Sequence, residues 1–198
     1  MEKWRVSLEA TAFNPGQFPE ESIPEIAIAG RSNVGKSSLV NRLLGKPLAH
    51  VAAKPGKTRS INFYRVDSPS GPFRLVDLPG YGYASRSKKE RRQWSALIED
   101  YITGRTTLSL ILHLADFRHG LMSSDASLQE WLYSLGLSVL VVFTKGDKIS
   151  RGARKGTLHK YIKSGLKSVD VPIVTSSEKG DGIAELGKFL ETHLSSGL

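Results

Sequence analysis

The chain has 198 residues, of which 39% are hydrophobic and 24% charged, a balance typical of a globular domain. It contains no cysteine, which excludes disulfide frameworks, thiolate catalysis and zinc–thiolate sites. Its 28 Lys and Arg exceed its 19 Asp and Glu, and a net charge of +9 favours either polyanionic partners or a solvated basic surface. The N-terminus lacks a signal-peptide core and the longest apolar run, 108–115, cannot span a bilayer, so we expect a cytoplasmic protein without membrane insertion.

Short apolar segments alternate with helical patterns along the whole chain. Residues 1–21 are expected to form an N-terminal extension, and the domain to occupy 22–198. The elements predicted in the first half are a strand at 25–30, a helix from Lys36 to about Leu44, and strands at 61–67 and 73–80 around the turn SPSGP.

The second half continues the alternation. The predicted elements are a helix from about Lys88 to Ile102, a strand at 108–115, a helix capped by Ser123 or Ser124 and ending near Tyr133, a strand at 138–145, a basic helix at about 151–165, a strand at 171–177 and a helix at 182–194. Apolar strands separated by helices imply an α/β fold with a six-stranded, mainly parallel sheet and helices on both faces. Ligands bind such sheets at the carboxyl ends of the strands.

Residues 30–38 (GRSNVGKSS) match the phosphate-loop pattern G-x-x-x-x-G-K-[ST] between a predicted strand and a predicted helix. The glycines let successive N–H groups point at phosphate oxygens, and the helix N-terminus adds positive potential. Lys36 is expected to neutralise the β- and γ-phosphates, and Ser37 to place its hydroxyl on Mg²⁺. The residues expected to bind the nucleotide here are Gly30, Arg31, Ser32, Asn33, Val34, Gly35, Lys36, Ser37 and Ser38.

A base-binding site is expected after two later strands. The carboxylate of Asp147 can accept hydrogen bonds from the N1–H and 2-amino groups of guanine, which adenine does not offer. The stem of Lys145 can lie along the base, and Ser176 and Ser177 can meet the guanine carbonyl oxygen, although a helix-capping loop explains SSEKG equally well. The residues assigned to the base are Thr144, Lys145, Gly146, Asp147, Thr175, Ser176 and Ser177.

Two loops are candidates for sensing the γ-phosphate. In DLPG (77–80), Asp77 can hold Mg²⁺ through water, and the N–H of Gly80 can approach the phosphate closely. In KPGKTRS (54–60), Thr58 can supply a second Mg²⁺ hydroxyl, so that both loops are ordered only while the phosphate is present. The residues assigned to the nucleotide are Gly56, Lys57, Thr58, Arg59, Ser60, Asp77, Leu78, Pro79 and Gly80, and those assigned to the metal are Ser37, Thr58 and Asp77.

In this order the motifs resemble those of translation-factor-class (TrmE-Era-EngA-EngB-septin-like) GTPases. The chain is most similar to the EngB family of bacterial ribosome-biogenesis GTP-binding proteins, through GRSNVGKSSLVN, PGKTRSINFY, DLPGYGYA and DFRHGL, over about residues 22–190. Position 59, commonly Gln in that family, is Arg59 here. The resemblance implies a Ras-like P-loop fold, GTP or GDP with Mg²⁺, a part in assembling the large ribosomal subunit, and a link to cell division and septation.

Slow hydrolysis is expected. Many GTPases place a glutamine directly after D-x-x-G to orient the attacking water, whereas this chain has Tyr81. The residues expected to act in hydrolysis are Lys36, Thr58, Gly80 and Asn33. Related GTPases with N-x-G-K-S hold K⁺ through the asparagine, so Asn33 is either a K⁺ ligand or a loop-shaping residue. A partner's arginine finger is the alternative accelerator.

The basic segments 86–92 and 151–167 are candidate contacts for ribosomal subunits or ribosomal RNA, with a solvated helix face as the alternative. The leading hypothesis is a monomeric, GTP-dependent switch that acts there. A small-molecule kinase would use the phosphate loop but usually lacks TKGD. A non-enzymatic protein of the division septum would depend little on the γ-phosphate.

Overall fold

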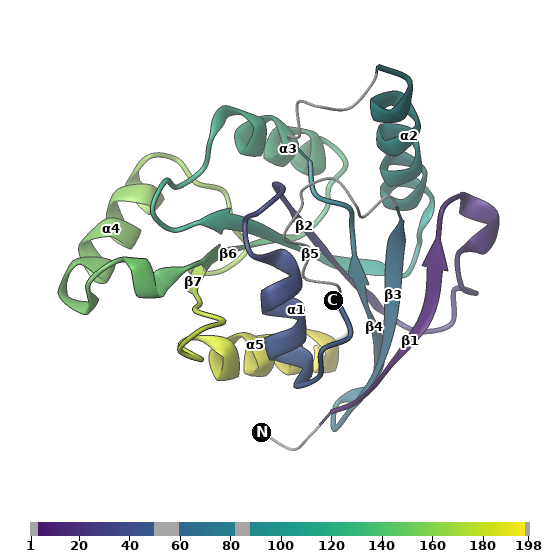
Figure 1. Cartoon of the computed structure of the whole chain (residues 1–198), viewed down its shortest axis with the longest axis horizontal. Helices are drawn as coiled ribbons and strands as arrows, with labels where there is room; N and C mark the ends of the chain where they lie inside the picture. The colour runs from purple at the N-terminus through teal and green to yellow at the C-terminus, as the bar shows by residue number, and fades with distance from the viewer. Residues whose placement is uncertain (1–3, 50–59, 82–87, 197–198) are drawn as a thin grey trace.

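A computed structural model gives the fold of residues 4–49, 60–81 and 88–196, with residues 88–94 described by their backbone alone. Its centre is a seven-stranded sheet in the order β1-β3-β4-β2-β5-β6-β7, flanked by helices on both faces (Figure 1). The strands are β1 (Arg5–Ala12), β2 (Glu25–Gly30), β3 (Ile61–Ser68), β4 (Gly71–Asp77), β5 (Leu108–Asp116), β6 (Val139–Thr144) and β7 (Ile173–Val174). The helices are α1 (Lys36–Leu44), α2 (Lys88–Gly104), α3 (Ser123–Ser134), α4 (Arg151–Lys163) and α5 (Ile183–Ser195), with short 3₁₀ turns η1 (Pro15–Gln17) and η2 (Gly146–Lys148).

The sheet is mainly parallel, as the alternating pattern predicts. Strand β2 pairs in parallel with β4 and β5, and β6 pairs in parallel with β5 and β7, whereas β3 is antiparallel to both β1 and β4. Every residue of β2 and β6 is buried. Because both faces of these strands are covered, they are continuously apolar instead of alternating. The parallel pairing brings the carboxyl ends of five strands to one edge of the sheet.

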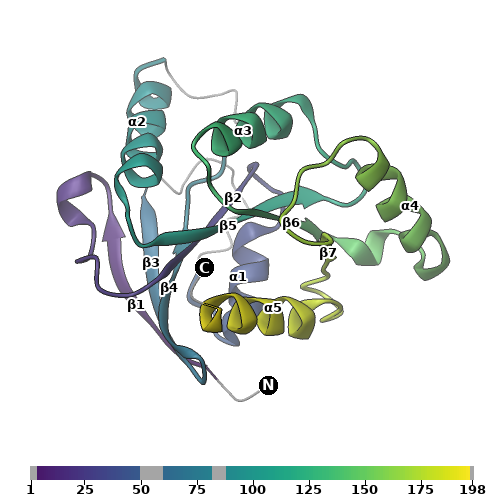
Figure 2. The same ribbon diagram turned by 180° about the vertical axis from the view of Figure 1, so that it is seen from behind.

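Helices α1 and α5 cover one face and α2 and α3 the other, as the two opposite views show (Figures 1 and 2). Leu39 and Val40 of α1 share a buried cluster with Leu186 and Leu190 of α5. Leu97 and Tyr101 of α2 and Leu132 of α3 belong to the cluster on the other face. Helix α4 packs beside β6 with Leu158 and Tyr161 against Phe117 and Phe143. No helix of the described ranges is long and apolar enough to cross a membrane.

The sheet has seven strands, not the six that the sequence predicts. The additional strand, β1, lies within the segment expected as an N-terminal extension and pairs with β3 at the edge of the sheet. Its pattern is hard to recognise because only Val6 and Ala12 are buried, and a register shift between Leu8 and Ala10 breaks the two-residue period. Trp4, just before it, packs edge-on against Phe73 with 5.5 Å between ring centroids.

Three element boundaries also differ from the predictions. The turn between β3 and β4 is shorter than SPSGP, because Ser68 pairs with Gly71. The N-cap of α3 is Met122 and not Ser123 or Ser124. The Met122 N–H donates to the Asp125 carboxylate at 2.8 Å. Strand β7 is only two residues long, against seven predicted: Pro172, directly before it, has no N–H to donate, and its register with β6 ends at Val174.

A buried ion network holds the amino end of β2. Glu25 is fully buried, and its carboxylate accepts hydrogen bonds from Arg74 (3.4 Å), from Tyr101 Oη (3.0 Å) and from two nitrogens of Arg105. Arg74 also pairs with Glu9 of β1 at 2.8 Å. The network therefore connects β1, β2, β4 and the end of α2, and each charge in it has an opposite partner.

We expect Glu25→Gln to lower the free energy of unfolding by about 3 kcal/mol, since it leaves two buried guanidinium groups short of a carboxylate. Urea denaturation followed by circular dichroism measures the loss. Asp67→Asn is the matched control, because it makes the same carboxylate-to-amide change in the exposed Arg65–Asp67 pair and should cost about 1 kcal/mol or less. Equal losses in the two variants would contradict a special role for the Glu25 network.

Candidate nucleotide-binding site

Four of the predicted motifs meet at the carboxyl edge of the sheet. The phosphate loop follows β2, DLPG begins at the last residue of β4, TKGD (144–147) begins at the last residue of β6, and the base-site segment 175–177 follows β7. Two backbone hydrogen bonds join the first two motifs, from Tyr81 N to Gly30 O (3.3 Å) and from Ser32 N to Tyr81 O (2.9 Å). The third and fourth are joined by Gly146 N donating to Thr175 O at 2.9 Å.

The phosphate loop has the left-handed backbone that its glycine pattern predicts. Gly35 has φ 101°, and Asn33 has φ 64°, a conformation that asparagine tolerates better than most residues. A Cβ on Gly30 would lie 3.0 Å from the Cβ of Leu114 and the Cγ1 of Val34, so the loop packs closely on β5. From the β6 side, Thr144 Oγ1 donates to Val34 O (2.6 Å) and Lys145 Nζ to Asn33 O (2.8 Å).

Lys36 and Asp77 form a buried ion pair beneath this loop. Lys36 is the first residue of α1 and Asp77 the last of β4, and both are more than nine-tenths buried. The ammonium group contacts the carboxylate directly. Their contact brings together the residues that the sequence assigns to phosphate neutralisation and to the metal. Ser37 follows on the same turn of α1 and is half-buried.

Gly80 lies against the phosphate loop. A Cβ there would be 3.1 Å from Ser32 N and 3.2 Å from Ser32 Cα, so only glycine allows this approach without a shift. The segment is aligned by Leu78 N, which donates to Ile28 O at 3.1 Å. A larger residue would separate DLPG from the loop at the place where the sequence expects the γ-phosphate.

The side chain of Tyr81 is directed to β5 and α3. Its hydroxyl donates to Asp125 Oδ1 at 2.6 Å and lies 2.7 Å from His113 Nε2, and both partners are buried. Burial, with the neighbouring Asp125 carboxylate, raises the pKa of Tyr81 well above its ordinary value. Sequence reasoning missed Asp125 and His113, although a histidine inside the apolar run 108–115 was a signal of a buried polar contact.

The base-site residues are held together by hydrogen bonds. Asp147 Oδ1 accepts from the buried Ser176 Oγ at 2.6 Å, and Asp147 Oδ2 lies 3.1 Å from Lys148 Nζ. The hydrogen bond from Ser176, with the nearby Lys148, lowers the pKa of Asp147 and keeps it ionised. A Cβ on Gly146 would lie 2.7 Å from Val174 Cγ1, which keeps β6 and β7 close here. Lys145 adopts φ 58° and pairs with Asp116 at 3.0 Å.

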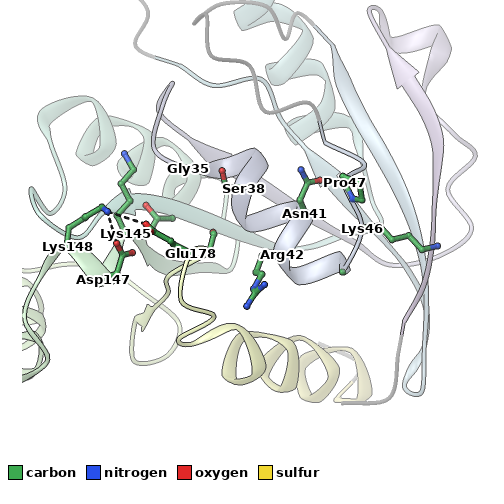
Figure 3. A pocket seen from close by; sticks show the side chains of 13 residues that line it. Gly35, Ser38, Asn41, Arg42, Lys46, Pro47, Lys145, Asp147, Lys148 and Glu178 are labelled. Atoms are coloured by element: carbon green, nitrogen blue, oxygen red, sulfur yellow. Dashed lines mark hydrogen bonds and ion pairs between the residues drawn. The ribbon is translucent and has the colours of Figure 1, made fainter.

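A pocket of about 780 Å³ opens beside these residues (Figure 3). Its lining includes Gly35, directly before α1, and Ser38 on α1, together with Lys145, Asp147 and Ser177. It continues along α1 past residues that sequence reasoning did not assign, namely Asn41, Arg42, Lys46 and Pro47. Asn41 and Arg42 lie on α1, and Lys46 and Pro47 follow its C-terminal end, so only the packing of this helix beside η2 brings them to the same pocket.

The other assigned residues are distributed as follows. Gly56, Lys57, Thr58 and Arg59 lie outside the described residues, whereas Ser60 is described and buried. Ser37 and Asp77 are thus the two metal-assigned side chains that the structure describes. Among the described residues there is no group of three or more His, Cys, Asp or Glu side chains that could hold a metal. A Mg²⁺ ion that keeps several waters does not require such a group.

Comparison with known proteins agrees with this arrangement. Residues 25–145 match the family described as 50S ribosome-binding GTPase. A probable GTP-binding protein EngB from Kosmotoga olearia is 46% identical over 187 residues, covering 94% of this chain and 97% of the relative.

Two solved structures share the fold. A crystal structure of a probable GTP-binding protein engB has a TM-score of 0.68 and 23% identity, covering 87% of this chain and 99% of that one. Era in complex with MgGDPNP and nucleotides 1506–1542 of 16S ribosomal RNA has a TM-score of 0.72 and 26% identity, covering 88% of this chain and 57% of Era. With the phosphate loop, DLPG and TKGD meeting at one edge of a Ras-like sheet, the chain belongs to the EngB family of P-loop GTPases, which bind and hydrolyse GTP.

Proposed function

We propose that this GTPase is a cytoplasmic, monomeric switch that acts on ribosomal RNA or assembling ribosomal subunits, the large subunit by family resemblance. By the same resemblance it is needed for normal cell division and septation. The observation that carries the proposal is an acid-free basic helix, α4, next to a guanine-nucleotide site. The MgGDPNP and ribosomal RNA named for the structurally similar Era support it.

The close packing of Gly30 and Gly80 suits a loop that wraps around phosphates. The loop 30–38 would hold them through its N–H groups, with Lys36 placed to neutralise their charge. Ser37 and Asp77, together with Thr58, would hold Mg²⁺, which supplies charge neutralisation for phosphoryl transfer. Because Lys36 and Asp77 already balance each other's charge in a buried place, phosphates and Mg²⁺ can replace that pairing without leaving either charge alone.

Base selectivity would come from Asp147, with Lys145, Ser176 and Ser177 beside it. Ser176 orients the Asp147 carboxylate by donating to one of its oxygens. A carboxylate in this position rewards the paired N1–H and 2-amino donors of guanine and penalises adenine. The pocket between Asp147 and α1 supplies room for the base and ribose.

Intrinsic hydrolysis would be slow, because the phenol of Tyr81 is engaged by Asp125 and His113 and does not orient water. We propose K⁺ held by Asn33 as the accelerator, with an arginine finger from a partner as the alternative. The left-handed backbone of Asn33 favours its loop-shaping role as well. A test must therefore remove the Asn33 side chain, which would bind K⁺, and keep the left-handed backbone that shapes the loop.

The surface proposed for RNA lies on α4 and the segment after it. Residues 148–169 contain seven Lys and Arg and no Asp or Glu. Lys155, Lys160 and Lys163 are exposed, whereas Arg154 pairs with Asp181 at 2.8 Å and is partly committed to the fold. Helix α4 has no buried residue, which leaves most of its circumference open to a partner. Of the segment 86–92, residues 88–92 lie in α2, and their side chains are outside the description.

Asp147→Asn should weaken GTP binding by about tenfold or more and favour xanthosine triphosphate, whose 2-carbonyl can accept from the new amide. Isothermal titration with both nucleotides measures the change in preference. Glu178→Gln is a matched control, because Glu178 lines the same pocket and pairs with the same Lys148 at 3.2 Å. Unchanged GTP affinity in Asp147→Asn would remove Asp147 from the base site.

Hydrolysis should be about tenfold or more faster in KCl than in NaCl at fixed ionic strength, since a bound cation adds fixed positive charge beside the phosphates. Single-turnover rates provide the measurement. Asn33→Gly should abolish the difference while keeping a residue that adopts positive φ easily. Equal rates in the two salts, or a K⁺ response retained by Asn33→Gly, would favour the arginine finger.

The double variant Lys155→Glu and Lys160→Glu should bind ribosomal subunits more weakly and with a shallower dependence on salt, because fewer phosphate counterions are released. Co-sedimentation with purified subunits, in GDPNP and in GDP, provides the measurement. Arg5→Glu with Lys188→Glu is the control with the same change of charge on other exposed positions. If the α4 variant binds subunits as well as the unmodified protein does, α4 is a solvated helix face and not an RNA contact. If subunit binding is the same in GDPNP and in GDP, the alternative of a non-enzymatic protein of the division septum is favoured.

A further inference from the structure

Tyr81 connects the nucleotide site to α3 through two independent attachments. Its backbone N–H and C=O are both bonded to the phosphate loop, at Gly30 and Ser32. Its side chain reaches the opposite way, to Asp125 in the first turn of α3 and His113 in β5. The residue is therefore held at both ends, and the chain at Gly80, one residue earlier, has little freedom to move.

The geometry determines how the protons are arranged in this cluster. Asp125 is a carboxylate with a lowered pKa: burial would raise the pKa, but the nearby His113 ring and the hydrogen bonds from Tyr81 Oη and Met122 N–H outweigh it. Both Asp125 oxygens accept, one from Tyr81 Oη at 2.6 Å and one from Met122 N at 2.8 Å. The Tyr81 proton is thus directed to Asp125, and Nε2–H of His113 donates to the phenol oxygen at 2.7 Å.

The other ring nitrogen supports this assignment. His113 is fully buried, and its Nδ1 has no hydrogen-bond partner among the described residues. A proton on Nδ1 would be a buried donor without an acceptor, which is costly. The tautomer with its proton on Nε2 leaves no ring N–H without an acceptor. His113 therefore donates to the Tyr81 hydroxyl, and Tyr81 donates to Asp125, so both contacts hold the phenol in one position.

From this we infer that Tyr81 is a positioning residue for the γ-phosphate: the Asp125–His113 anchor on its phenol holds Gly80 close to Ser32, where the Gly80 N–H meets the third phosphate. The inference rests on the role proposed for Gly80. The position that carries the water-orienting glutamine in many GTPases thus serves here to preorganise the backbone. Preorganisation favours GTP over GDP because only GTP presents the phosphate that Gly80 contacts.

Tyr81→Phe tests the anchor, since it removes the hydroxyl and keeps the ring. We expect affinity for GDPNP to fall about tenfold and affinity for GDP to change less than about twofold, as measured by isothermal titration with Mg²⁺ present. Asp125→Asn, which keeps the volume and a neutral acceptor, should have a smaller effect of the same kind. In the Asp125→Asn background, Tyr81→Phe should cost less than it does alone, because the two residues act as one unit.

Tyr101→Phe is the matched control. It also removes a buried phenol that donates to a buried carboxylate, Glu25 at 3.0 Å, but on α2 at the opposite edge of the sheet. It should lower the melting temperature without changing the GDPNP-to-GDP affinity ratio, which separates positioning from loss of stability.

An unchanged ratio in Tyr81→Phe, or an equal loss for both nucleotides, would overturn the inference. The GDPNP and GDP titrations use the isolated protein without ribosomal subunits, so a failure of the subunit-binding proposal would leave this inference intact. If Gly80→Ala leaves GDPNP affinity unchanged, the proposed role of Gly80 fails, and the inference fails with it.

Discussion

The parallel pairing of β2 with its neighbours is the constraint on which the rest of the structure depends. Strand β2 is buried throughout and pairs with β4 on one side and β5 on the other. This register places Gly30, Asp77 and Asp116 at a common edge, because parallel strands end together. Each loop at that edge then needs partners for its backbone groups, and the neighbouring loop supplies them, as in the reciprocal bonds of Tyr81 with Gly30 and Ser32.

Buried charge is arranged in pairs at both ends of the sheet, with different consequences. At the amino end of β2, Glu25 is surrounded by Arg74, Arg105 and Tyr101, all supplied by the chain itself. At the carboxyl end, Lys36 and Asp77 form an ion pair with each other among the described residues. The first network is complete and fastens β1 and α2 to the sheet. Under the proposed function, phosphate oxygens and a hydrated cation would rearrange the second pair, since they provide the same charges.

Helix α4, which carries the basic surface, contacts two loops next to the candidate nucleotide site. Arg154 of α4 pairs with Asp181, in the loop whose Ser176 orients Asp147. Tyr161 packs on Phe117 and donates to its carbonyl at 3.0 Å, directly after Asp116, the partner of Lys145. The helix that carries exposed lysines is thereby fixed to the loop that contains Ser176 and to the segment after β5 whose Asp116 pairs with Lys145. This gives the charge of α4 a defined orientation relative to the site.

The sequence by itself determined the order of the helices and strands from residue 25 onward, the mainly parallel sheet and the identity of the phosphate loop, because continuous apolar strands and a glycine pattern before a helix are local signals. It did not predict β1, whose edge position buries too few residues to set a period, or the two-residue length of β7. Only the tertiary structure brought Ser176 to Asp147, and Asp125 with His113 to Tyr81. These contacts join residues 29 to 44 positions apart, and distances between such residues depend on how strands are paired, which no local pattern encodes.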